Sequence, residues 1–195
     1  MCSRLNRDRR ELVEQELSSE SIYQGELLRV YKDRVRLPDG EESTREWIRH
    51  PGACAIVPVF PDGTIQLVRQ YRYPVRQLFL EVPAGKIDPG EPPEKTARRE
   101  TLEETGWKPA SIAYAGHFYP VIGYSDEIIH TWVAWDLEKA ETGMDDDEFL
   151  EPEILHFQEA IRGVADGTIT DGKTICALQQ AANWWRSNGP FPIRF

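Results

Sequence analysis

A nearly continuous apolar run, ACAIVPVF at 53–60, restricts the fold more than any other part of the sequence. Such a run is typical of a strand buried on both faces, because a half-exposed strand alternates apolar and polar residues. The turn signal Pro61-Asp62-Gly63 follows, and TIQLVRQY at 64–71 returns, so we expect a hairpin. Strands come first and helices are inserted singly. This order favours an α+β fold, or an α/β/α sandwich with a mixed sheet, over a regular βαβ repeat.

The other elements are read from local patterns. We expect a polar segment over 1–19, helical around 11–17, and then two antiparallel strands within 21–37 on either side of Gly25. Further strands are expected at 46–49, 78–82, 111–118, 128–137 and 154–157, and helices at 91–105, 158–166 and 173–188. A boundary at 50–52 would separate a small β unit (1–50), a candidate dimerisation element, from a main domain (51–195).

Composition excludes several classes of protein. The 195 residues suffice for one domain with a small extension, and the formal net charge of -10 argues against a nucleic-acid binder, which would show a basic face. Three cysteines without CxxC spacing give neither a disulfide framework nor a zinc site. We find no secretory signal and no apolar run of the roughly 20 residues that span a bilayer. We therefore expect a cytoplasmic protein without membrane or nucleic-acid partners.

The helical segment EKTARRETLEET at 94–105 is poor in apolar residues and rich in carboxylates. Glu100, Glu103 and Glu104 share one arc, because residues three and four apart are neighbours on a helix. Like charges at this spacing repel, and divalent cations such as Mg²⁺, which prefer oxygen ligands, are the simplest compensation. Arg99 can orient one carboxylate by a charge-assisted contact. Taken without its flanks, the segment fits a solvated acidic face better, because that is what most charge runs are.

The flanks identify the segment. The string GKIDPGEPPEKTARRETLEETGW at 85–107 resembles the Nudix box, G-x5-E-x7-R-E-U-x-E-E-x-G-U, in which U is a bulky apolar residue. Every fixed residue matches: Gly85, Glu91, Arg99, Glu100, Glu103, Glu104 and Gly106. The final U is Trp107, whereas the first U is Thr101, which is smaller and polar, so the helix is expected to pack differently there. The resemblance implies the Nudix-type α/β/α sandwich.

The resemblance also implies a metal site and its ligands. Glu100 and Glu104 would be the main ligands of Mg²⁺, for which Mn²⁺ can substitute, with Glu103 sharing an ion and the backbone carbonyl of Ala84 completing the shell. Glu103 and Arg99 would take part in catalysis, and Glu91 would support them. Gly85 would allow a close approach of the loop, and Gly106 would end the helix. Such a site polarises a phosphoryl oxygen and favours attack by water.

Other stretches resemble the ADP-ribose pyrophosphatase branch of the family, which cleaves nucleoside diphosphate sugars. They are YQGELLRVYKDRVRLPDG at 23–40, RHPGACAIVPV at 49–59, QLVRQYRYPV at 66–75, LEVPAGKIDPGE at 80–91 and GYSDEIIH at 123–130. The branch often has a proline just before the glycine that corresponds to Gly123. This chain has Ile122 there, and the nearest proline in this chain is Pro120. This departure leaves other nucleoside diphosphate sugars open as substrates.

The branch resemblance suggests substrate contacts. Arg72, and with less support Arg69, would bind the diphosphate or ribose, since a guanidinium donates two parallel hydrogen bonds. Tyr31, like Tyr23 and Trp47, could stack on the base, and Gly123 and Glu127 would lie in the substrate loop. In the competing interpretation the two arginines lie on the surface without a substrate, and the three aromatic residues belong to the core or to an interface. In this branch the N-terminal strands exchange across a homodimer, which we expect here.

A general base is also needed. The branch often uses a glutamate on a loop after the last long strands, and DDDEFLE at 145–151 fits that position. We select Glu148, with Glu151 and Glu127 as alternatives, because a carboxylate within reach of the attacking water can take its proton. A solvated acidic loop is the competing interpretation. The expected products are a nucleoside monophosphate and a sugar phosphate.

The sequence allows two other functional classes. One is a different Nudix specificity, for a GDP-sugar, a dinucleotide or dinucleoside polyphosphate, or a damaged nucleoside triphosphate. The separate N-terminal β unit argues against the compact triphosphate hydrolases, which lack it. The other class is a non-catalytic nucleotide-binding module, which usually loses box carboxylates that this chain keeps. A purely structural protein would leave the glutamate cluster unexplained.

Overall fold

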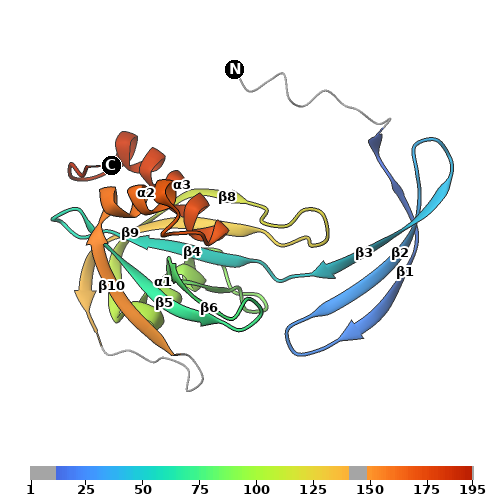
Figure 1. Ribbon diagram of the computed structural model, residues 1–195, viewed down its shortest axis with the longest axis horizontal. Coiled ribbons are helices and arrows are strands. Elements are labelled where there is room, and N and C mark those ends of the chain that lie inside the picture. Colours follow the sequence, from blue (N-terminus) through green and yellow to red (C-terminus); the bar gives the residue numbers. More distant parts are fainter. Residues whose placement is uncertain (1–11, 141–148, 195) are drawn as a thin grey trace. The chain divides into compact units, whose positions relative to one another are not determined.

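The computed structural model describes residues 12–140 and 149–194, and the chain divides into two compact units (Figure 1). The first unit contains the described residues up to His50 together with Val121–Asp126. The second contains Pro51–Pro120 and the described residues from Glu127 onward. None of the helices in these described ranges is both long and apolar enough to span a membrane.

The first unit is an antiparallel sheet of three strands, β1 (Gln15–Gln24), β2 (Arg29–Arg36) and β3 (Glu42–Arg49), in the order β1-β2-β3. The helical character expected around 11–17 is wrong for its described end, because Gln15 opposite Arg36 already belongs to the β1–β2 ladder. Val121–Asp126 attaches to β3, where the Ile48 amide donates to the Tyr124 carbonyl oxygen at 2.8 Å. That segment therefore belongs to this unit although it lies far along the chain.

The first unit has almost no core of its own. Nearly all of β1 is exposed, and the buried residues of the sheet are Asp33 and Val35. The Trp47 indole donates to Asp33 Oδ2 at 2.7 Å and stacks on Tyr31 with 5.1 Å between ring centroids. Backbone ladders, these side-chain contacts and surface ion pairs such as Arg34–Glu42 hold the sheet together.

The second unit is built around a mixed sheet of β7 (Ala84–Lys86), β4 (Ala53–Pro58), β9 (Ile129–Lys139) and β8 (Trp107–Phe118), in that order. β4 and β9 run parallel, and the other pairs are antiparallel. Helix α1 (Pro93–Thr105) packs against β4, β7 and β8, and helix α3 (Gly172–Asn188) packs against β4, β8 and β9. Helix α2 (Phe157–Asp166) lies beside α3 (Figure 1).

Successive residues of β4 point to opposite faces of the sheet, which explains the α/β/α layers. Its residues are all buried, as the apolar run predicted. Cys54 and Ile56 join a small cluster with Ala97 of α1, whereas Ala55 and Val57 join the main core with residues of α2 and α3. One strand thus contributes to both sides of the sheet, and the mixed α/β/α sandwich expected from the sequence is confirmed.

A second sheet has the order β10 (Leu150–His156), β5 (Thr64–Arg72) and β6 (Gln77–Glu81). The hairpin expected between 53–60 and 64–71 is therefore wrong beyond its turn, where Val59 and Ile65 form an isolated bridge. Both edges of β4 are taken, by β7 and β9, so β5 leaves and pairs with β6 and β10 instead.

Candidate active site

Helix α1 has well-defined ends. Pro92 precedes it in an extended conformation, with φ -65° and ψ 138°, and Pro93 opens the first turn, where its missing N–H costs nothing. Gly106 ends the helix with φ 73°, and its N–H donates to the Leu102 carbonyl at 2.8 Å. This left-handed conformation is cheap for glycine alone. Two local signals thus place the carboxylates on a helix of fixed length.

The backbone at β7 comes very close to the helix. A Cβ atom placed on Gly85 would lie 1.8 Å from Glu100 Oε1. A side chain at this position would displace the Glu100 carboxylate, so glycine is needed to keep that carboxylate in place rather than for its φ angle. The Glu100 carboxylate therefore packs directly against the backbone of the loop that precedes α1.

Glu104 is held by the same short strand. The Ala84 amide donates to Glu104 Oε2 at 3.0 Å. Glu100 and Glu104 are each only 8% exposed, which is uncommon for glutamate and costly unless the charge is compensated. Two carboxylates are thus gathered between α1 and the 84–85 backbone, as the sequence spacing predicts for neighbours four residues apart.

Arg99 lies among the carboxylates of the box. Its Nη1 atom is 2.7 Å from Glu100 Oε1 and 2.8 Å from Glu103 Oε2, and its Nη2 atom is 3.2 Å from Glu91 Oε2. Burial lowers the pKa of Arg99, but the Glu100 charge and the hydrogen bonds to Glu103 and Glu91 outweigh it and raise the pKa. Arg99 therefore offsets part of the repulsion between these carboxylates.

Glu91 supports this arrangement from the loop before α1. It accepts from the Thr96 hydroxyl at 2.8 Å and pairs with Arg99 and Lys95. The hydrogen bond from Thr96, followed by that from Arg99, lowers the pKa of Glu91. Glu91 is therefore a charged anchor for the Arg99 guanidinium.

The donor set fits a hard divalent cation. The site offers carboxylate oxygens on adjacent turns of α1, with the backbone of the 84–85 loop packed against them. Mg²⁺ prefers oxygen ligands of this kind. Among residues 12–140 and 149–194, no group of three or more His, Cys, Asp or Glu side chains is arranged to hold a metal ion. Binding a cation would require Glu100 and Glu103 to turn from Arg99 toward the ion.

The two β5 arginines have different partners. Arg72 Nε donates to Glu81 Oε1 at 2.8 Å and Arg72 Nη2 to Glu81 Oε2 at 2.5 Å, a bidentate clamp. These hydrogen bonds raise the pKa of Arg72 despite its burial, and the charges of Asp171 and Glu104 add to the effect. Arg69 instead pairs with Glu153 of β10. Arg72 is thus clamped to a residue three positions before Ala84 of the box loop, whereas Arg69 is paired with β10.

Sequence reasoning missed Glu81 and its second partner, Lys173. Glu81 ends β6 and is 1% exposed, and Lys173 Nζ donates to its Oε2 atom. The signal was present in LFLEV at 78–82, where a charged residue interrupts an otherwise apolar strand. Lys173 gave no such signal, because its partner lies in a distant part of the chain.

The other expected site residues are distributed over both units. Tyr31 and Gly123 belong to the first unit, and Tyr31 is stacked on Trp47 with the Arg49 guanidinium 4.5 Å from its ring centroid. Glu127 belongs to the second unit and is half-buried, and Glu151 is exposed in β10. Glu148, the expected base, lies outside the described residues.

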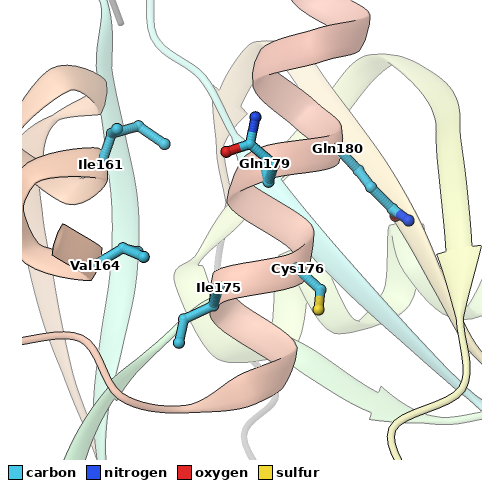
Figure 2. A pocket seen from close by; sticks show the side chains of 6 residues that line it. All are labelled: Ile161, Val164, Ile175, Cys176, Gln179 and Gln180. Atoms are coloured by element: carbon cyan, nitrogen blue, oxygen red, sulfur yellow. The ribbon is translucent and has the colours of Figure 1, made fainter. Parts of the chain in front are cut away.

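A hollow of about 320 Å³ lies between α2 and α3 (Figure 2). Figure 2 shows Ile161 and Val164 extending from α2 toward α3, and Ile175 extending back. The lining of the hollow is mostly apolar and also includes Cys176, Gln179 and Gln180. It contains no residue of the box and no charged side chain that could bind a diphosphate. This hollow is therefore a poor candidate for a diphosphate site, and the carboxylate cluster on α1 is the better one.

Two family models match the chain. Residues 48–178 match the NUDIX domain, and residues 14–48 match the Nucleoside diphosphate sugar hydrolase N-terminal domain. The solved structure described as an ADP compounds hydrolase is similar with a TM-score of 0.80 and 22% identity, over 90% of this chain and 96% of that one. At this identity the likeness concerns the fold.

Curated relatives are similar over most of their length. A Bacillus methanolicus protein named methanol dehydrogenase activator is 39% identical over 85% of this chain and 91% of its own. An ADP-ribose pyrophosphatase of Bacillus subtilis (strain 168) is 38% identical over 86% of this chain and 92% of its own. A GDP-mannose pyrophosphatase of Yersinia enterocolitica is 38% identical over 68% and 74%.

Proposed function

Because the chain belongs to the Nudix family and is a Nudix pyrophosphohydrolase, we propose that it hydrolyses ADP-ribose or a related nucleoside diphosphate sugar. The observation that carries the proposal is the pair of buried carboxylates, Glu100 and Glu104, held against the backbone at 84–85. The match of residues 14–48 to the N-terminal domain of nucleoside diphosphate sugar hydrolases supports this substrate class.

The proposal includes a divalent cation, Mg²⁺ with Mn²⁺ as a substitute. Glu100 and Glu104 would hold it with Glu103 and the Ala84 carbonyl, and Arg99 would orient Glu100 and Glu103. When bound, the cation supplies charge neutralisation at the phosphoryl oxygens and acidifies water. The oxygen-only donor set is the support for this choice.

The chain's own groups would divide the remaining work. Arg72 would bind the diphosphate, since its clamp to Glu81 uses two of the five guanidinium N–H groups and three are not engaged by Glu81. A carboxylate would take the proton of the attacking water, with Glu148 proposed for this role and Glu151 or Glu127 as alternatives. Water oxygen bonds to one phosphorus, and the bridging P–O bond breaks. The products are a nucleoside monophosphate and a sugar phosphate.

A GDP-sugar is the second candidate substrate. One relative that is 38% identical is named GDP-mannose pyrophosphatase, although it matches less of the chain than the ADP-ribose pyrophosphatase does. Ile122, in place of the branch's proline, is the sequence feature that leaves base or sugar recognition open. Gly123, Tyr31 and Arg69 are proposed substrate contacts that would differ in importance between the two substrates.

We further propose a homodimer in a reducing cytoplasm, with a small molecule rather than nucleic acid as substrate. The first unit exposes Ile22, Tyr23, Leu27 and Leu28 over a sheet with almost no core, and a second copy would bury them. Cys54 and Cys176 are free, which supports a reducing compartment. Light scattering should give twice the 22.4 kDa chain mass at micromolar concentration, and a single-chain mass would contradict the dimer.

The function is tested with a substrate panel in Mg²⁺: ADP-ribose, GDP-mannose, a dinucleoside polyphosphate and a nucleoside triphosphate. We expect ADP-ribose to rank first and Glu104→Gln to lose at least about 100-fold in turnover, as expected when a metal-positioning group is removed. Glu94→Gln is the matched control, because Glu94 is an exposed residue of the same helix, and it should stay within about twofold.

The possible results of this panel distinguish the ligand assignment, the substrate and the function itself. Equal activity of Glu104→Gln and the parent would refute the ligand assignment. A preference for GDP-mannose would select the second candidate substrate, and a preference for a triphosphate would overturn the branch but keep the box chemistry. If the folded parent hydrolyses no pyrophosphate linkage with Mg²⁺ or Mn²⁺, the proposed function is wrong.

A further inference from the structure

Glu81 is an almost completely buried carboxylate with two cationic partners from different elements. Its Oε1 and Oε2 atoms accept from Arg72 of β5, and its Oε2 atom also accepts from Lys173 Nζ, at the start of α3. A buried carboxylate is costly unless it is paired and hydrogen-bonded, and here both conditions are met. The ionic contact between Glu81 and Lys173 joins residues 92 positions apart in the sequence.

Lys173 is itself fixed. Its side chain is 16% exposed, and Nζ also donates to Asp171 Oδ2 at 2.8 Å. Asp171 caps α3 by accepting from the Thr174 amide at 3.0 Å and from the Thr174 hydroxyl at 2.6 Å. The Val82 amide donates to the Thr174 hydroxyl oxygen at 2.9 Å, which ties the cap to the residue after Glu81. Arg72 and Lys173 are thus paired with Glu81, and Lys173 is paired with Asp171 as well.

The Arg72 side chain is more exposed than that of Glu81, its partner in the clamp. Its side chain is 42% exposed, near the end of β5, and the exposed Tyr73 and Val75 follow in the β5–β6 turn. A half-exposed arginine on a hairpin samples many side-chain conformations unless its guanidinium is held. Glu81 holds it, and Lys173 ties Glu81 to α3 on the other side.

On the basis of the proposed function, we infer that Lys173 is a positioning residue, which acts through Glu81 to hold the Arg72 guanidinium in place for the diphosphate. The clamp fixes the guanidinium plane while leaving N–H groups for the substrate. Lys173 does not touch the substrate. Glu81 precedes Ala84 by three residues, and the Ala84 amide donates to Glu104 Oε2 at 3.0 Å, so a short stretch of backbone joins the clamp that holds Arg72 to the box.

The test is a double-mutant cycle of Lys173→Met and Arg72→Lys, measured with the diphosphate that the parent hydrolyses best. Lys173→Met should lower kcat/KM about tenfold or more, because a misplaced binding group loses much of its effect. In the Arg72→Lys background the same change should cost less than about twofold, since no guanidinium remains to be positioned. Lys173→Arg should recover most of kcat/KM, and Lys108→Met, at an exposed position in β8, is the control.

A purely structural role predicts a different pattern. Lys173→Met would then lower the free energy of unfolding in urea but leave kcat/KM per folded molecule unchanged, or its effect on kcat/KM would be the same in both backgrounds. Either result, with the folded fraction measured by circular dichroism, overturns the inference. Non-additive kcat/KM values at equal folded fractions support it.

A second readout does not depend on activity. The Arg72 Nε–H nuclear magnetic resonance signal, assigned by its absence in Arg72→Lys, should be protected from hydrogen exchange in the parent and exchange at least about tenfold faster in Lys173→Met. Equal protection in both proteins overturns the inference. If the parent hydrolyses no diphosphate, the proposed function fails, while this measurement still decides whether Lys173 holds Arg72.

Discussion

The two helices that cover opposite faces of the central sheet bury different kinds of side chain. The buried residues of α1 are Thr96, Ala97, Glu100, Thr101 and Glu104. The buried residues of α3 are Thr174, Ala177, Leu178, Ala181, Ala182 and Trp185. Of the α1 set, Ala97 alone enters a hydrophobic cluster, whereas all but one of the α3 set belong to the main core.

This contrast separates stability from chemistry. Apolar burial stabilises by roughly 25 cal/mol for each Å² removed from water, and α3 supplies more of it than α1 does. Buried carboxylates cost free energy and are tolerated on α1 because Arg99 and the Ala84 amide compensate them. Changes on the α3 face should therefore affect folding, and changes on the α1 face should affect turnover. The following predictions test that division, from the largest expected effect to the smallest.

Leu178→Ala should remove the most stability. Leu178 is fully buried in the main core, and truncation of such a leucine costs about 2–5 kcal/mol of unfolding free energy. Turnover per folded molecule should stay within about twofold. Urea unfolding and kcat measure the two effects. The same change at the half-buried Leu102 of α1 should cost less than about 2 kcal/mol, and a larger cost there would contradict the comparison.

Gly85→Ala should affect turnover rather than folding. The added methyl would meet the Glu100 carboxylate, which must move away from the loop backbone. A displacement of about 1 Å can cost on the order of 100-fold in rate, so we expect a loss of that size in kcat. Gly172→Ala, which meets open space at the start of α3, is the control. Similar kcat values for the two variants would show that Glu100 tolerates the shift.

Thr101→Val should have the smallest effect. The Thr101 hydroxyl is buried and donates to the Ala97 carbonyl at 2.6 Å, a bond that competes with the helix ladder. Losing it removes about 0.5–1.5 kcal/mol, which the added apolar burial offsets, so we expect a net change below about 1 kcal/mol. Thermal unfolding gives the stability and kcat the activity. A tenfold fall in kcat would mean that Thr101 has a role besides packing.

Several features of the fold were predictable because they are local. The apolar run at 53–60 identified a strand buried on both faces, and the prolines and Gly106 marked the ends of α1. The box spacing placed Glu100 and Glu104 on the same side of one helix, since that relation depends on helical periodicity alone. The segment around 11–17 was misread because polar strands at a sheet edge lack the alternation that marks a buried strand.

The sequence by itself determined the family, the metal-ligand candidates and most element positions, because each depends on spacing within a short segment. The tertiary structure decided which distant segments meet. It paired β5 with β6 and β10, attached Val121–Asp126 to β3, and brought Lys173 and Arg72 to the same buried carboxylate. Such contacts depend on which strand edges are already occupied and which buried charge needs a partner, and neither is written in any single segment.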